Sequence, residues 1–175
     1  MTRMRASRWL TAGVAGCLLA LTACGDGDDS GNPDEEIEVT SSATPTAEPE
    51  ETDPIVVDPP RTHDRIEDEG MGVTWTLQQP TAGPNGGVII TVRIRNDNEE
   101  PLHPDSLDEP SLEIGGESVD RLPAEDAGTV NQDGLDLPLG AGAATNLRFP
   151  YDTTVGALSD AEFSIGNVVY RGNLN

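Results

Sequence analysis

Short runs of alternating apolar and polar residues, separated by glycine and proline, make up most of the chain from Met71 onward. The clearest run is Val88 to Asn96, where one face is apolar (Val88, Ile90, Val92, Ile94) and the other carries Ile89, Thr91, Arg93 and Arg95. Alternation with a period of two predicts a strand that is buried on one face, because successive side chains of a strand point to opposite sides of the sheet. No stretch of helical periodicity competes with it. The sequence therefore predicts an all-β fold.

Further strands are expected at Val73–Leu77, Leu112–Ile114, Glu117–Val119, Ala143–Phe149, Ala161–Ile165 and Val168–Tyr170. Gly115-Gly116 and Gly166-Asn167 separate neighbouring runs and indicate hairpin turns. About seven strands with turns between them, over roughly 100 residues, are typical of an antiparallel β-sandwich. We expect residues 71–175 to form this domain.

Cysteine usage limits what can stabilise that domain. The two cysteines are Cys17 and Cys24, and neither lies within residues 71–175. The predicted sandwich therefore has no disulfide and must fold on its apolar core alone, which a domain of about 100 residues can do.

Residues 24–70 have the composition of a disordered tether. Asp, Glu, Ser, Thr and Pro dominate, and apolar residues are few and scattered apart from Ile55-Val56-Val57. Such a segment cannot bury enough apolar surface to offset the entropy of ordering. Prolines and like charges extend a chain of this kind. We expect it to hold the domain away from its attachment point.

The N-terminal segment has the layout of an export signal. Arg3, Arg5 and Arg8 precede a short apolar stretch that ends at Leu21-Thr22-Ala23-Cys24, too short to span a bilayer as a helix. These four residues resemble the lipobox of bacterial prolipoproteins. The resemblance implies that residues 1–23 are a signal peptide and that Cys24 is lipidated. The mature protein is then expected on the extracytoplasmic face of the cell membrane, anchored through Cys24.

The C-terminal region resembles the immunoglobulin-like (telokin-like) domains of bacterial surface lipoproteins of unassigned function. The resemblance is carried by Val92–Leu102, by Leu137–Gly142 and by Leu147–Pro150. It implies an immunoglobulin-like sandwich and carries no established catalytic residues. The chain departs from antibody domains because it lacks the inter-sheet cysteine pair, and because Trp75 falls on the first expected strand of residues 71–175.

The strong negative charge excludes some partners. The formal net charge is −22, and it falls to about −25 without residues 1–23, which hold three arginines and no acid. Nucleic-acid binding needs basic residues that replace counterions, so we expect no nucleic-acid partner. Attachment to the membrane is expected through the lipid on Cys24 and not through a basic surface.

Motifs for catalysis or metal binding are weak. There are two histidines, His63 and His103, and there is no G-x-S-x-G motif, so a nucleophile would have few candidate bases. Asp26–Gly31 imitates the start of a calcium loop, but Ile37 stands where the loop needs glutamate. His103 and nearby acids, among them Asp97 and Asp105, could instead form a weak oxygen-rich ion site. We expect no cofactor, no metal site and no enzymatic activity, an envelope hydrolase being the least favoured possibility.

Three residues of the predicted domain are candidates for partner contact. Arg93 and Arg95 form a positive stripe opposite Val92 and Ile94, for which intramolecular ion pairing is the simpler interpretation. Tyr151, which follows Pro150 at a strand end, is the aromatic residue most expected to be exposed. We expect a surface lipoprotein that presents a β-sandwich to an unknown protein or cell-envelope partner. The alternative is a solute- or metal-binding accessory lipoprotein.

Overall fold

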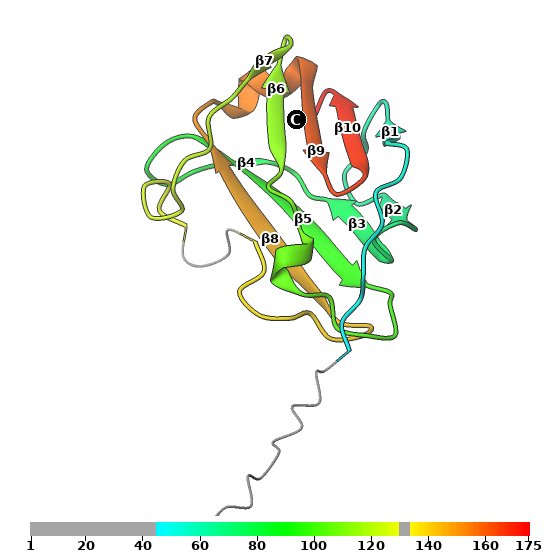
Figure 1. Cartoon of the computed structure of the whole chain (residues 1–175). Helices are drawn as coiled ribbons and strands as arrows, with labels where there is room; N and C mark the ends of the chain where they lie inside the picture. The colour runs from blue at the N-terminus through cyan, green and yellow to red at the C-terminus, as the bar shows by residue number, and fades with distance from the viewer. Residues whose placement is uncertain (1–44, 130–133) are drawn as a thin grey trace, which may run out of the picture. The chain divides into compact units, whose positions relative to one another are not determined.

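The computed structural model describes residues 45–129 and 134–175, which form two five-stranded sheets (Figure 1). The first sheet has the order β1 (Ile55–Val57), β10 (Val168–Gly172), β9 (Ala161–Ile165), β6 (Ser111–Ile114) and β7 (Glu117–Ser118). The second has the order β2 (Arg65–Asp68), β3 (Val73–Leu77), β5 (Val88–Asn96) and β4 (Thr81–Ala82), and β8 (Ala144–Tyr151) also pairs with β5. Two short 3-10 helices complete the described elements, η1 (Pro104–Ser106) and η2 (Val155–Asp160). The predicted all-β, two-sheet fold is confirmed.

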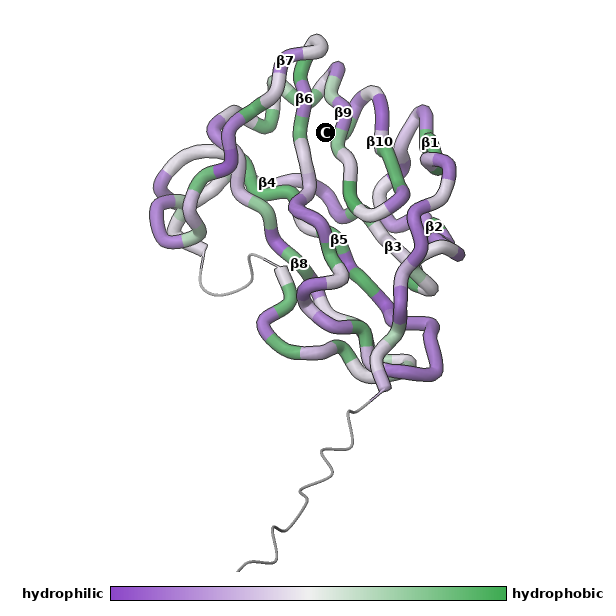
Figure 2. Tube along the Cα trace, viewed as in Figure 1, coloured by the Kyte–Doolittle hydropathy of each residue, from purple (hydrophilic) through white to green (hydrophobic). Residues whose placement is uncertain are grey.

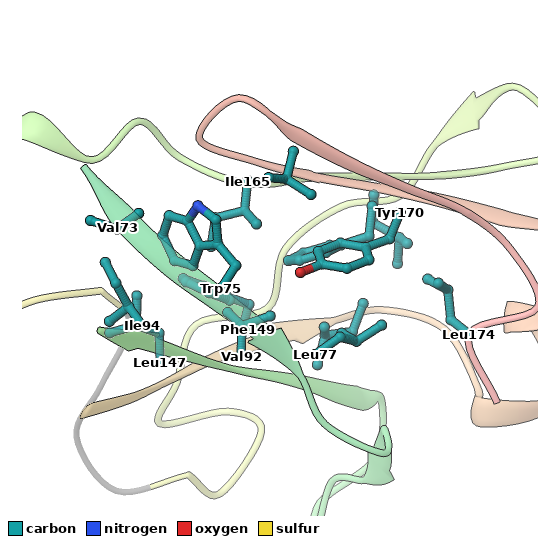
Figure 3. Close-up of a cluster of buried hydrophobic side chains, with 14 of the residues drawn as sticks. Val73, Trp75, Leu77, Val92, Ile94, Leu147, Phe149, Ile165, Tyr170 and Leu174 are labelled. Atoms are coloured by element: carbon teal, nitrogen blue, oxygen red, sulfur yellow. The ribbon is translucent and has the colours of Figure 1, made fainter. Parts of the chain in front are cut away.

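Strand alternation builds the core, as the sequence predicts. Along β5 the side chains of Val88, Ile90, Val92 and Ile94 are fully buried, whereas Arg93 and Arg95 are exposed. Hydrophobic and hydrophilic segments alternate along this strand in Figure 2. Side chains of both sheets meet in one core, where Trp75 and Leu77 of β3 face Ile165 and Tyr170 of the first sheet (Figure 3). Pairing along β8 leaves β5 hydrogen-bonded on both sides.

An aromatic cluster joins the sheets around Phe163. Its ring lies 6.3 Å from the rings of Phe149 and Tyr151 and 6.4 Å from that of Tyr170, measured between centroids. Aromatic pairs at this separation stabilise a fold by more than the burial of their apolar area alone. Because Phe149 and Tyr151 come from β8 while Phe163 and Tyr170 come from β9 and β10, the cluster fixes one sheet against the other.

Both predicted hairpin turns are present. Gly115 and Gly116 join β6 to β7, and both have positive φ (61° and 83°), as a type I′ turn requires. Gly166 and Asn167 join β9 to β10, and Gly166 has a φ of 54°. A Cβ at Gly166 would lie 2.5 Å from Sδ of Met71. This turn therefore needs glycine both for its backbone and for its close packing.

The expected disordered tether is wrong for residues 45–70, which belong to the fold. The backbone N–H of Ala47 donates to Pro101 O (3.0 Å), and that of Glu50 donates to Gly70 O (2.8 Å). The segment then enters β1, which pairs with β10 in parallel, whereas the other strand pairs are antiparallel. Composition misled the prediction because Ile55 and Val57 pack against the core only after this non-local pairing. Residues 24–44 of the expected tether lie outside the described residues.

Asp68, at the end of β2, is a buried carboxylate (1% exposed) that links the two sheets. Its Oδ1 accepts hydrogen bonds from Met71 N (3.1 Å) and Asn167 Nδ2 (2.9 Å). Its Oδ2 accepts from Trp75 Nε1 (3.2 Å) and Asn167 N (3.0 Å). Asn167 also donates to Glu50 O (3.1 Å), so the network reaches the N-terminal segment. Buried carboxylates are tolerated when donors surround them in this way.

Replacing Tyr170 by Phe is expected to leave stability unchanged or to raise it by about 1 kcal/mol, because the buried Tyr170 hydroxyl has no hydrogen-bond partner in the described part of the chain. Tyr151→Phe is the matched control. Its hydroxyl donates to Pro110 O (2.9 Å), so its loss should lower the free energy of unfolding by about 1 kcal/mol. Urea unfolding at pH 7 measures both variants. Equal losses in the two variants would contradict the assignment.

The same tyrosines predict a loss of stability in alkali. Burial raises the pKa of both phenols above the ordinary value of 10.0. Above pH 10 the unfolded chain releases phenolic protons that the folded chain retains, so the free energy of unfolding falls as pH rises. Tyr170→Phe should show a smaller fall between pH 9 and 11 than the parent protein, as measured by urea unfolding at each pH.

Candidate functional site

The outer face of the second sheet gathers basic residues on an otherwise acidic protein. Outward positions carry Arg65 on β2, Arg93 and Arg95 on β5, and Arg148 on β8. All four side chains are exposed, and they are four of the seven arginines in the described residues. Arg95 and Arg93 lie on β5 two residues apart, which places their Cβ atoms about 7 Å from each other.

Strand register places Arg65 and Arg93 on either side of the same residue of β3. Thr76 on β3 is paired with Arg65 on one side and with Arg93 on the other, and Thr74 is paired with Arg95. Adjacent strands lie about 4.8 Å apart, so the Cα atoms of Arg65 and Arg93 are separated by about 10 Å with a threonine between them. Short side chains on the middle strand and long ones on both flanks produce a hollow.

This hollow has a volume of about 350 Å³ and is lined by His63, Arg65, Thr74, Thr76, Arg93 and Arg95. His63 comes from the turn before β2 and adopts a positive φ of 72°, which is uncommon for a residue other than glycine. Its backbone N–H donates to Leu77 O (2.8 Å), which holds the turn beside the end of β3. We call these six residues the arginine hollow.

Charges inside the arginine hollow are only partly neutralised. Arg95 Nη1 lies 3.1 Å from Asp97 Oδ1, and the Thr74 hydroxyl donates a short hydrogen bond to the other oxygen of Asp97. Within residues 45–129 and 134–175, Arg65 and Arg93 form no ion pair. Intramolecular pairing, the simpler expectation for the stripe, therefore holds for Arg95 but not for Arg93.

Two neighbouring depressions frame the hollow. One, of about 370 Å³, shares Arg65, Thr74 and Arg95 with it and adds four acidic residues, Glu67, Asp68, Glu69 and Asp97. The other, of about 450 Å³, includes Thr91, Asn146 and Arg148. Asn146 Oδ1 accepts a hydrogen bond from Gln78 Nε2 (2.9 Å). The face is thus acidic at one end and basic or neutral polar over the remainder.

Of the predicted contact residues, Arg93 and Arg95 come together on this face, but Tyr151 does not join them. The expected exposure of Tyr151 is wrong, since its side chain is fully buried. The strand β8 continues through Pro150, so Leu147, Phe149 and Tyr151 all point inward with a period of two. Sequence reasoning also missed Arg65 and His63, which it placed in a disordered tether. The sequence offered no signal for His63, and for Arg65 it offered only one apolar residue, Ile66, between two charged ones, which is too little to predict a strand.

The candidate ion-site residues of the sequence can be compared with the structure only in part. Among the described residues, no three His, Cys, Asp or Glu side chains are arranged to hold a metal ion. His103 Nδ1 lies 3.3 Å from Asp105 Oδ2, while Asp97 is engaged by Thr74 and Arg95. The imitation calcium loop at Asp26–Gly31 and the expected lipidation site, Cys24, lie outside the described residues.

No described helix is both long and apolar enough to cross a bilayer.

Comparison with known protein families, with curated proteins and with solved structures finds no significant match to this chain.

The arrangement is suited to holding an anion. Guanidinium groups present several N–H donors in a planar fork, which matches the oxygens of carboxylates and phosphates, and they stay protonated at physiological pH. Among the described residues, the lining of the hollow holds three arginines and no carboxylate, and two of these arginines have no acidic partner. At physiological ionic strength the Debye length is about 8 Å, so distant acids of this chain are largely screened at the hollow.

Proposed function

We propose that this protein is a non-enzymatic surface lipoprotein whose β-sandwich binds an anionic partner in the cell envelope through the arginine hollow. The observation that carries the proposal is the meeting of Arg65 and Arg93, neither of them ion-paired within the described residues, on one sheet face of a chain with a net charge of −22. Like charges placed close together on a sheet oppose folding, so a bound anion would relieve their repulsion.

The N-terminal features support the anchored part of the proposal. Leu21-Thr22-Ala23-Cys24 closes an apolar segment preceded by three arginines. A diacylated Cys24 supplies two acyl chains, which is enough for stable attachment to a bilayer. Anchored in this way, the sandwich meets envelope components at high local concentration, so even a modest affinity of the hollow would suffice.

A second candidate is a solute-binding accessory lipoprotein. It is favoured by the size of the hollow, since about 350 Å³ is within the range of small-molecule sites. The two candidates share the same residues and differ in whether the anion belongs to a free solute or to another envelope component.

Photo-crosslinking in intact cells tests the proposed function. A photoreactive residue replaces Thr91, on the face of the hollow, or Ser164, on the outward face of β9 as a control. We expect adducts from position 91 that disappear in the Arg65→Gln/Arg93→Gln double variant. They should persist in Arg171→Gln, which removes an arginine from the other sheet. Adducts from both positions, or adducts that survive the double variant, would contradict the proposal.

The anchor is tested in the same cells. Cys24→Ala should move the protein out of the membrane fraction and abolish the adducts from position 91, as followed by fractionation and immunoblotting. Mass spectrometry of the parent protein should find lipid on Cys24. A Cys24→Ala protein that remains in the membrane fraction would refute the anchor.

A further inference from the structure

Donor groups in the arginine hollow outnumber what a single carboxylate can accept. Arg65, Arg93 and Arg95 border the hollow, with His63 and Thr76 between them. The Thr74 hydroxyl is already committed to Asp97. One guanidinium group satisfies a carboxylate through two parallel hydrogen bonds. Several guanidinium groups converging on one volume instead suit a tetrahedral anion with three or four acceptor oxygens.

Placement of the arginines allows this convergence. Arg65 and Arg93 stand on opposite flanks of Thr76, about 10 Å apart at their backbones. Each side chain is long enough to reach the middle of that gap, where Thr76 forms the floor and can donate from its hydroxyl. Arg95 is held nearby by its ion pair with Asp97 (3.1 Å) and retains further N–H donors.

Volume and charge agree with the same ligand class. About 350 Å³ accommodates a phosphate group together with part of the molecule that bears it. Arg65 and Arg93 supply two positive charges that no carboxylate of the described residues neutralises, which matches the charge of a phosphate monoester near neutral pH. Glu67 and Asp97, in the adjoining depression, would repel a ligand that extended toward them.

We propose that the arginine hollow is a phosphate-binding site, with Arg65 and Arg93 as its principal ligands and with Thr76 and Arg95 completing it. This inference rests on the proposed function and names the chemical class of its anionic partner. Arg65 and Arg93 bind the phosphate oxygens, and the ion pair with Asp97 orients Arg95.

Isothermal titration of the full chain, purified in a neutral detergent at low ionic strength, tests the site with inorganic phosphate. We expect saturable heat with phosphate and none with chloride at matched ionic strength. Arg93→Gln and Arg65→Gln should each weaken binding at least tenfold, Arg93→Lys should weaken it less, and Arg171→Gln should change it less than twofold. All of these positions are exposed, and an unchanged emission spectrum of Trp75 would show that the fold is retained.

Two further probes distinguish the source of the phosphate. Glycerol 3-phosphate carries a monoester, and glycerophosphoglycerol carries the diester of an anionic phospholipid headgroup. Tighter binding of glycerol 3-phosphate assigns the site to a soluble phosphate ester. Tighter binding of glycerophosphoglycerol assigns it to a lipid headgroup or a diester polymer. Either result supports a phosphate-binding site.

Absence of saturable phosphate binding, or an equal loss in Arg93→Gln and Arg171→Gln, would overturn the inference. Adducts from position 91 that depend on Arg65 and Arg93, found together with no phosphate binding, would overturn the phosphate assignment alone. If the parent protein forms no adducts from position 91, that result would instead count against the proposed function.

Discussion

A chain that begins at Met71 is expected not to fold, whereas one that begins at Ser42 is expected to fold as the full chain does. The shorter chain contains every strand that the sequence predicts, but it lacks β1 and β2. Removing them strips Ile55, Val57 and Ile66 from the core and uncovers an edge of β3. It also deletes Asp68 with its four hydrogen bonds, two of which join it to Asn167 in the β9–β10 turn of the other sheet.

The combined loss should reach about 5 kcal/mol or more, which is as large as the whole stability of many domains. Lost burial of three partly buried apolar side chains contributes about 1 kcal/mol each, and the orphaned donors around Asp68 contribute the remainder. Far-UV circular dichroism and the emission of Trp75 report the outcome, because Trp75 is the only tryptophan after Trp9. A chain from Met71 with cooperative urea unfolding like that of the longer chain would show that the N-terminal strands are dispensable.

Asp68→Ala is expected to lower the free energy of unfolding by about 3 kcal/mol. The substitution leaves Trp75 Nε1 and the backbone N–H of Asn167 without their acceptor, and each buried donor left unsatisfied costs about 1–3 kcal/mol. The free energy of unfolding of Asp68→Asn should lie between those of Asp68→Ala and the parent protein, since an amide keeps one acceptor oxygen but replaces the other with a donor. Urea unfolding followed by Trp75 emission measures the series.

Glu69→Ala is the matched control for that series, because it removes the same charge from the next residue, where the side chain is exposed. It should change the free energy of unfolding by less than about 0.5 kcal/mol. If Asp68→Ala were no more destabilising than Glu69→Ala, the carboxylate could not be what joins the β2–β3 turn to the β9–β10 turn.

Much of the fold was predictable because strand alternation is a local signal. Val73–Leu77, Val88–Asn96 and Ala161–Ile165 are strands with the predicted bounds. Gly115-Gly116 and Gly166-Asn167 form turns where expected. In each case the backbone conformation and the buried face depend on residues that are neighbours in the sequence. A run of a few residues is therefore enough to predict the strand or turn.

The candidate site was only half predictable. The outward direction of Arg93 and Arg95 follows from the alternation along their own strand. Arg65 reaches them only because β2 pairs with β3, and the three residues before it give no period on which to base a strand. Tyr151 was misplaced for a related reason, since Pro150 was taken as the end of a strand that in fact continues.

By itself, the sequence determined the fold class, the bounds of three strands, the absence of a disulfide from residues 71–175 and the outward face of Arg93 and Arg95. Only the tertiary structure decided that Ile55–Val57 joins β10 in parallel, that Asp68 is buried between turns nearly 100 residues apart, and that Arg65 meets Arg93 across Thr76. The physical reason is the range of the interactions. Alternation is set by neighbours along the chain, whereas these contacts are set by strand pairing between distant segments. No local pattern of charge or hydrophobicity encodes that pairing.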